Sequence, residues 1–247
     1  MSKQIWKPGA LLAPVPPVLV SCGTVEKPNL LTIGWTGIVS THPAMTYISV
    51  RPERYSYPMI REGGCFVINL TTEELCRAAD FCGVRSGREV DKLAHCGLTV
   101  SPASTVSAPI LNESPVNIEC RVRQVLELGS HHMFLAEITA IQVDDRLVDG
   151  GRLCLDRAEL VAYAHGEYFA LGGKLGSFGY TVRKRPQKKN SAPPNGKAEQ
   201  DRRPAGERKA AAKSGADQGK RPAQRTAGGQ KPGKARPRSG NTRRRTP

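Results

Sequence analysis

The sequence predicts a mainly β protein, in which a mostly antiparallel sheet curls into a barrel and a disordered basic tail follows. Residues 116–128 and 133–143 alternate apolar and polar side chains on either side of Gly129 and Ser130, as a long hairpin with one solvated face does. From Arg185 onward there is no Leu, Ile, Val, Met, Phe, Tyr, Trp or Cys. Because such a segment has no large apolar side chain to bury, nothing offsets the conformational entropy that it would lose on ordering. We therefore expect it to be disordered.

Further strands are expected before the long hairpin. Residues 18–39 are rich in β-branched and apolar side chains and are interrupted by a turn at 26–29, which is typical of a second hairpin. Two shorter apolar runs, 45–52 and 65–70, indicate single strands.

Two short helices are expected between the strands. Thr71 and Glu74 have the spacing of a capping box ahead of an apolar stripe. Ser86 and Glu89 repeat that spacing, and Gly97 is a suitable end for a second helix of about ten residues.

The charge divides the chain into two regions. Residues 1–184 hold 18 Lys and Arg against 18 Asp and Glu, and residues 185–247 hold the other 19 of 37 basic and 4 of 22 acidic residues, which accounts for the net charge of +15. We therefore expect one domain at 1–184, long enough for a real core, and a tail at 185–247. The tail is either a solvated solubility segment or a weak, salt-sensitive binder of nucleic acid and other polyanions.

No run of 18 apolar residues is present, and the prolines at 14, 16 and 17 interrupt the apolar stretch near the amino terminus. The sequence thus predicts a soluble cytoplasmic protein without a membrane segment.

The cysteines do not predict a metal site. They are odd in number and scattered, with no CxxC pair and no Cys and His cluster at ligand spacing, at positions 22, 65, 76, 82, 96, 120 and 154. Most are expected to be small buried residues, whereas Cys82, just upstream of a basic turn, is expected to have a lowered pKa.

Two basic turns stand out in an otherwise neutral domain. The first, with Arg85, Arg88 and Lys92, is predicted at a helix start, where unpaired N–H groups receive anions. Nearby acidic residues allow the alternative of a self-paired surface helix. The second follows a strand end and brings Arg51 and Arg54 together, a combination suited to phosphate unless neighbouring glutamates pair with them.

A third candidate feature is the segment 32–40, TIGWTGIVS. Its glycines flank Trp35 and Thr36 on a predicted strand, where glycine often marks the close approach of a ligand. A bulge at a barrel corner would explain the same glycines.

Several long segments occur in the order of one known family: PNLLTIGWTGIVSTHPAMTYISVRPERYSYPMI, FVINLTTEEL, DFCGVRSGREVDKL, APILNESPVNIECRV, LGSHHMFLAEI and AYAHGEYFALGGKLGSFGYTVRK. Over roughly residues 15–184 the chain resembles the flavin reductase-like family, and within it the flavoredoxin branch. The resemblance implies an antiparallel Greek-key split β-barrel with a few short helices, a homodimer, and FMN held near the subunit interface.

The resemblance also implies a set of cofactor-binding residues. By motif they correspond to the positions that the family uses around the ring, the ribityl chain and the phosphate of FMN. The residues are Trp35, Thr36, Ser49, Val50, Arg51, Arg54, Tyr55, Cys82, Gly83, Ser86, Gly87, Lys92 and Tyr168. His165 is the one candidate catalytic residue, as a group that orients a nicotinamide or donates a proton. The other four histidines have no visible carboxylate or cysteine partner and are expected to be structural.

The expected function is an FMN-dependent oxidoreductase. It would be either a flavin reductase that uses NADH or NADPH, or a flavoredoxin-like carrier that passes electrons to a redox partner protein. No GxGxxG motif follows a predicted strand, so a nicotinamide donor would dock transiently. Two alternatives are a nucleic-acid-binding protein that acts through the tail, with the barrel as a dimerising scaffold, and a redox sensor that works through Cys82.

Overall fold

The structure, a computed structural model, describes residues 1–183, which form one compact unit. The predicted basic tail lies outside the described residues, and the division into 1–184 and 185–247 stays a prediction. The large strands are β1 (Val18–Gly23), β2 (Pro28–Ile33), β3 (Thr36–Thr41), β4 (Ala44–Val50), β5 (Cys65–Leu70), β8 (Val116–Leu128) and β9 (His131–Val143).

Short elements fill the connections between these strands. The helices are α1 (Ser56–Gly63), α2 (Cys76–Val84) and α3 (Lys92–Cys96), with single 3₁₀ turns at Asp145–Leu147 and Leu155–Arg157. Three small strand pairs are formed by β6 (Val100–Ser101) with β7 (Ile110–Leu111), β10 (Val148–Asp149) with β11 (Arg152–Leu153), and β12 (Val161–Ala164) with β13 (Glu167–Ala170). None of the helices in residues 1–183 is long and apolar enough to cross a membrane.

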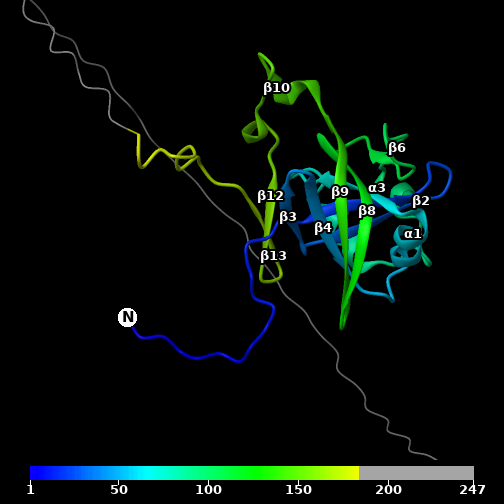
Figure 1. The fold of residues 1–247 in the computed structure, drawn as a ribbon, viewed down its shortest axis with the longest axis horizontal. Helices are drawn as coiled ribbons and strands as arrows, with labels where there is room; N and C mark the ends of the chain where they lie inside the picture. Colours follow the sequence, from blue (N-terminus) through cyan, green and yellow to red (C-terminus); the bar gives the residue numbers. More distant parts are fainter. Residues whose placement is uncertain (184–247) are drawn as a thin grey trace, which may run out of the picture. The chain divides into compact units, whose positions relative to one another are not determined.

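The expected antiparallel split barrel is confirmed. Seven strands form one antiparallel sheet in the order β2-β1-β5-β8-β9-β4-β3, and β5 returns beside β1 in the manner of a Greek key (Figure 1). The edges are β2 and β3, and the chain passes from one to the other through Gly34 and Trp35. Because β2 also approaches β4, the sheet curls round and leaves a split along this edge.

Alternation along β1 and β2 fixes which side chains enter the barrel. Val18 and Val20 lie in the barrel interior with Phe66 and Phe134, whereas Leu19 and Leu30 pack on the other face, under α2 and α3. Both faces of β1 are therefore covered, which explains why its sequence is apolar at consecutive positions.

The strand predictions are largely correct. The long hairpin is β8 and β9, with β9 beginning two residues earlier than expected, and residues 65–70 coincide with β5. The first hairpin turns at residues 24–27, because Pro28 and Asn29 already pair with Gly23 and Cys22. Trp35, expected inside a strand, lies in the bend between β2 and β3.

The prediction of a capping box at Thr71 is wrong. Helix α2 begins at Cys76, and the Leu75 N–H donates to Thr72 Oγ1 at 3.3 Å, whereas Thr71 Oγ1 is buried without a hydrogen-bond partner. Thr71 is instead held against the carboxy-terminal segment, since its carbonyl accepts from the Val161 N–H at 3.2 Å.

The second predicted helix start is also wrong, and this changes the setting of the basic turn. The Ser86 carbonyl accepts from the N–H groups of Glu89 and Val90, which closes a turn after the end of α2. Helix α3 begins at Lys92 with Asp91 as its cap and, as expected, ends at Gly97 in the left-handed conformation. Residues 85–90 therefore follow the carboxy-terminal end of a helix.

Helix α1 was not predicted. Its third residue is Pro58, which the first helical turn tolerates because the missing N–H has no intrahelical partner to lose there. The consequence for the site is that Arg51 and Arg54 lie in the short turn between β4 and α1.

Candidate functional site

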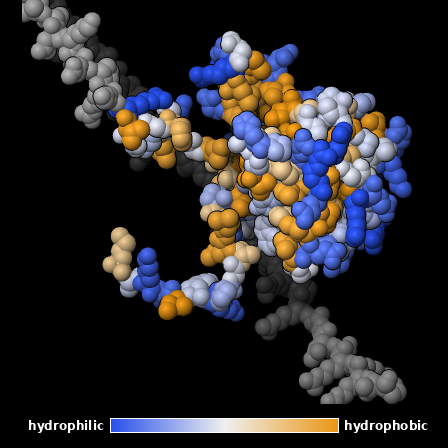
Figure 2. Space-filling view, viewed as in Figure 1, coloured by the Kyte–Doolittle hydropathy of each residue, from blue (hydrophilic) through white to orange (hydrophobic). Residues whose placement is uncertain are grey.

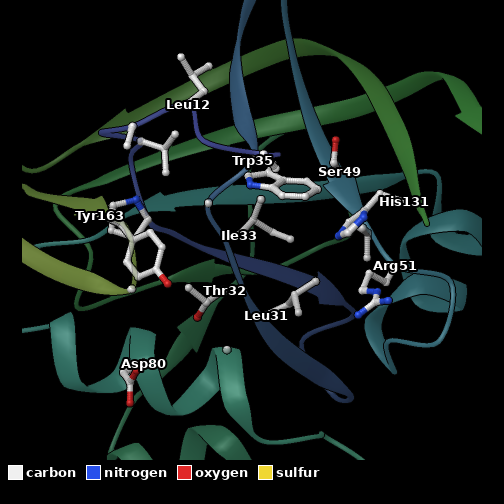
Figure 3. A pocket seen from close by; sticks show the side chains of 18 of the residues that line it. Leu12, Leu31, Thr32, Ile33, Trp35, Ser49, Arg51, Asp80, His131 and Tyr163 are labelled. Carbon is white, nitrogen blue, oxygen red and sulfur yellow. The ribbon is translucent and has the colours of Figure 1, made fainter. Parts of the chain in front are cut away.

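A cavity of about 680 Å³ opens at the split of the barrel. Its floor is formed by residues 31–33 of β2, and its wall by Gly34 and Trp35 from the bend and by Ser49 and Val50 at the end of β4 (Figure 3). The volume lies in the range of sites for small molecules and cofactors.

One end of the cavity is cationic. Arg51 and Arg54 follow β4 and line the cavity. Arg51 Nε lies 3.9 Å from Glu53 Oε2, a long contact between two side chains that are 56% and 77% exposed. Such a surface contact is weak and leaves guanidinium N–H groups for an anion.

Trp35 and His131 form an aromatic wall beside this cationic end. Their ring centroids are 4.4 Å apart with a tilt of 44°, and the Trp35 carbonyl accepts from the Ser49 N–H at 3.0 Å. Burial lowers the pKa of His131, and the positive charge of Arg51 lowers it further. His131 is therefore held as a neutral imidazole at pH 7.

His131, expected to be structural, lines the cavity. His132, next in the chain, points away, and its Nδ1 lies 2.7 Å from Tyr57 Oη and 3.9 Å from Glu127 Oε1. Consecutive residues of a β-strand point to opposite faces of the sheet, so His131 and His132 have different surroundings.

The carboxy-terminal hairpin closes another side of the cavity. Tyr163, His165, Gly166 and Tyr168 of the β12–β13 hairpin line it, as expected for His165 and Tyr168. His165 has a φ of 52° in the hairpin turn. The Tyr163 and Tyr168 rings meet edge to face, with centroids 5.1 Å apart.

The amino-terminal segment is a part of the wall that was not predicted. Residues 10–13 line the cavity, and Val15 is fixed to Tyr163 by two backbone hydrogen bonds of 2.9 and 2.8 Å. Figure 3 shows Leu12 above the cavity on the side of Trp35. Two segments far apart in sequence thus close the site together.

Eight of the predicted site residues line this cavity, and they come from four segments of the chain. They are Trp35, Ser49, Val50, Arg51, Arg54, Gly83, His165 and Tyr168. The other six predicted residues, Thr36, Tyr55, Cys82, Ser86, Gly87 and Lys92, are absent from its wall.

Thr36, Tyr55, Ser86 and Gly87 have partners within the protein. Thr36 Oγ1 donates to the Tyr47 carbonyl at 2.6 Å, and Ser86 Oγ accepts from the Arg88 N–H at 3.2 Å. The guanidinium of Arg88 lies over the ring of Tyr55, at 5.9 Å. Their contact with a ligand stays a prediction.

Lys92 points into the protein and is 4% exposed. Its Nζ donates to the carbonyls of Leu30 and Cys82 at 2.7 and 2.8 Å, and burial lowers its pKa. A cation that ties a strand to a helix in this way has a structural role whether or not an anion lies nearby.

The predicted lowering of the Cys82 pKa is wrong. The side chain is fully buried, and burial, followed by the neighbouring Cys96, raises the pKa of the Cys82 thiol to about 12. The basic turn lies beyond the end of α2, so it supplies no helix amino terminus to stabilise a thiolate.

Comparison with known proteins gives a consistent result. The model of the flavin reductase like domain matches residues 12–172. An uncharacterized protein of Archaeoglobus fulgidus is 33% identical over 139 residues, which cover 56% of this chain and 78% of that protein. One from Pyrococcus abyssi is 28% identical over 58% of this chain and 81% of its own length.

Solved structures with the same fold include two flavoredoxins. The flavoredoxin of Desulfovibrio vulgaris (Miyazaki F) is 30% identical with a TM-score of 0.68, and the match covers 74% of this chain and all of that one. The flavoredoxin of Methanosarcina acetivorans is 25% identical with a TM-score of 0.67 over the same shares. An FMN-binding protein of Thermus thermophilus, 21% identical with a TM-score of 0.60 over 72% of this chain and 99% of that one, shares the fold.

The fold is that of a split-barrel protein with a cavity at the open edge of the sheet. With more than half of its length matched, the chain belongs to the flavin reductase-like family and, within it, to the flavoredoxin branch.

Proposed function

We propose that the chain binds FMN in the cavity at the split of the barrel and acts as an oxidoreductase, reduced by NADH or NADPH or passing electrons to a protein partner. The observation that carries the proposal is the combination, in one cavity, of two guanidiniums and a flat aromatic wall. The named relatives support it, because they include flavoredoxins and an FMN-binding protein.

The residues present fit the parts of FMN. Arg51 and Arg54 would hold the phosphate, since guanidinium N–H groups form charge-assisted hydrogen bonds with phosphate oxygens. Trp35 and the apolar side chains of Ile33 and Val50 would flank the ring. Gly34 lines the same wall without a side chain, and its backbone would approach the edge of a flat ligand.

Bound FMN supplies the redox chemistry, as an acceptor of hydride and a donor of electrons. The chain's residues bind the phosphate, orient the ring and restrict water. His131 is kept neutral by burial and by Arg51, so it adds no positive charge beside the ring. His165, in the exposed hairpin turn of the cavity wall, would contact a second substrate.

The proposal is tested by the absorbance spectrum of the protein after addition of FMN and desalting, followed by anaerobic NADH and then NADPH. Retained flavin that bleaches with one nucleotide supports a reductase and identifies its donor. Retained flavin that bleaches with dithionite alone supports an electron carrier. Absence of bound flavin, together with no oxidation of NADH or NADPH when free FMN is added, refutes the proposal.

Arg51→Ala provides a residue-level test. If Arg51 bonds to the phosphate, the variant should bind FMN more weakly, with a loss of about 1.5 to 3 kcal/mol in binding free energy. Arg77→Ala, an exposed arginine of α2 outside the cavity wall, is the matched control. Equal affinities for the two variants would remove Arg51 from the site.

A homodimer is proposed as the working form. Ile38 and Val39 of the edge strand β3 are 66% and 49% exposed, and Phe169 of β13 is 49% exposed. Figure 2 shows apolar side chains gathered on the side of the molecule that carries the β12–β13 hairpin. Exposed apolar surface on this scale favours association. A monomeric mass in light scattering, unchanged by Ile38→Glu, would contradict it.

A second candidate function is weak binding of nucleic acid by the basic tail. The excess of positive charge in residues 185–247 favours it. Removal of residues 185–247 should leave flavin binding unchanged and abolish salt-sensitive binding to an oligonucleotide. Loss of flavin binding in that variant would mean that the tail takes part in the first function.

A further inference from the structure

The two ends of the cavity differ in charge. Figure 3 shows Arg51 and His131 on one side and Asp80 with Tyr163 on the other, and Trp35 between them. Asp80, from α2, and Tyr168 complete the second end. A ligand that fills the cavity therefore meets guanidiniums at one end and a carboxylate with phenols at the other.

Asp80 is held in place by close packing between α2 and the cavity floor. Thr32 Oγ1 donates a hydrogen bond to the carbonyl of Ala79, the residue before Asp80. A Cβ on Gly83, one turn later, would lie 3.3 Å from Thr32 Cβ, a tight contact, so glycine there helps the helix to lie close to β2. The backbone at Asp80 is thus held close to Thr32 of the cavity floor, and the exposed Asp80 side chain extends from this point into the cavity wall.

The carboxylate of Asp80 retains capacity to accept hydrogen bonds. Tyr168 Oη donates to Asp80 Oδ1 over a long 3.5 Å, and among residues 1–183 no lysine or arginine pairs with Asp80. Burial, and then the charge of Asp80, raise the pKa of Tyr168 to about 12, so the phenol stays protonated as a donor. A carboxylate has sites for several donors, and one long hydrogen bond leaves most of them for a ligand.

We propose that Asp80, oriented by Tyr168, is a specificity-determining residue that accepts a hydrogen bond from an N–H group at the edge of a planar ligand. The inference rests on the proposed function, because it assigns a ligand N–H group to the end of the cavity opposite the proposed phosphate site. The same N–H chemistry is present in two molecules of the proposed reaction: the pyrimidine edge of the flavin and the carboxamide of the nicotinamide. A flavin would be bound by its phosphate at the arginine end and by its N–H edge at Asp80, whereas a nicotinamide would meet Asp80 beside the bound flavin.

The experiment compares each ligand with an analogue that lacks the N–H group. FMN and N3-methyl-FMN are titrated into the wild-type protein, and the flavin-loaded protein is assayed with NADH and with the reduced 3-acetylpyridine analogue. The wild type should prefer the N–H ligand of one pair by about tenfold or more, the size expected for a hydrogen bond to a charged acceptor. A preference within the flavin pair would show that the flavin provides the N–H group, and a preference within the nicotinamide pair would show that the nicotinamide provides it.

The variants decide whether Asp80 causes the preference. Asp80→Ala should bring that ratio close to one, and Asp80→Asn, which has the same size but no charge, should give an intermediate ratio. Glu74→Gln, an exposed acid that precedes α2 outside the cavity wall, is the control and should keep the wild-type ratio. A change in fold alone would affect both ligands of a pair, not their ratio.

The outcomes separate the inference from the proposed function. Wild-type protein that binds FMN but shows the same ratios in Asp80→Ala and Asp80→Asn overturns the inference and leaves the proposed function standing. Wild-type protein that binds no FMN and oxidises neither NADH nor NADPH overturns both.

Discussion

Arg54 donates a hydrogen bond from Nη1 to the carbonyl oxygen of Gly83 at 3.0 Å, and so joins the turn after β4 to the last turn of α2. Carbonyls in the last turn of a helix lack intrahelical partners and carry the negative end of its dipole. Arg54 therefore stabilises the helix end and contributes positive charge to the cavity at the same time, whereas Arg51 has a single long surface contact with Glu53.

These two arginines should differ when each is replaced by alanine. Arg54→Ala should lower the free energy of unfolding by about 1 kcal/mol and also weaken FMN binding, because both a helix-end hydrogen bond and a phosphate contact are lost. Arg51→Ala should weaken FMN binding and leave the stability of the free protein unchanged. Urea unfolding with and without FMN measures both effects, and equal stability of the two variants would contradict the assignment.

The basic turn shows where sequence reasoning failed. Capping-box spacing at Ser86 and Glu89 predicted a helix start, but the segment is held as a turn by contacts from residues distant in sequence. A Cβ on Gly87 would lie 2.3 Å from Asn29 Oδ1 and 2.7 Å from Tyr55 Cδ1. Local patterns cannot report such packing, so the end of one helix was mistaken for the beginning of another.

Gly87→Ala should consequently be costly. The added methyl group must displace Asn29, whose Nδ2 donates to Ser56 Oγ at 2.6 Å in the protein interior, and we expect a loss of about 1 to 3 kcal/mol in unfolding free energy. Gly63→Ala is the matched control, because a Cβ there meets nothing within 4 Å and its φ is not left-handed. Thermal unfolding that ranks Gly63→Ala below Gly87→Ala would refute this account.

The cavity illustrates what the sequence could and could not predict. Strands were recognisable because alternation is a local pattern, and the resemblance supplied Trp35, Arg51 and Arg54. The pairing of β4 with β9, in which Val50 faces His132, is not local, and it is this register that brings His131 to the cavity beside Trp35 and Arg51. The amino-terminal segment was missed for the same reason, since its contact is with a hairpin almost 150 residues later.

Cys82 should be unreactive. Its thiol is fully buried and its pKa is raised to about 12, whereas Cys76 and Cys96 are partly exposed. Alkylation with iodoacetamide at neutral pH, followed by peptide mass spectrometry, should modify Cys76 or Cys96 before Cys82. Cys82→Ser should leave the time course unchanged, and rapid labelling of Cys82 in the folded protein would restore the redox-sensor hypothesis.

A buried carboxylate lies on β8, outside the cavity wall. Glu119 of β8 is fully buried, and its oxygens accept hydrogen bonds from the N–H and hydroxyl groups of Ser104 and Thr105 and from Gln142 Nε2. Burial alone would raise the pKa of Glu119. The bonds from Gln142, Thr105 and Ser104 outweigh burial and lower the pKa from 4.5 to about 2.

This carboxylate should make stability fall in acid. Between about pH 4.5 and pH 2 the unfolded chain binds a proton at Glu119 that the folded protein does not, so the free energy of unfolding decreases as the pH falls, by about 3 kcal/mol in total. Glu119→Gln should be less stable at pH 7 and should lose this part of the pH dependence. Glu113→Gln is the control, because Glu113 accepts equivalent bonds from Thr99 but is exposed. Urea unfolding at pH 7, 5, 4 and 3 measures the slope, and an identical slope for wild type and Glu119→Gln would show that the acid sensitivity arises elsewhere.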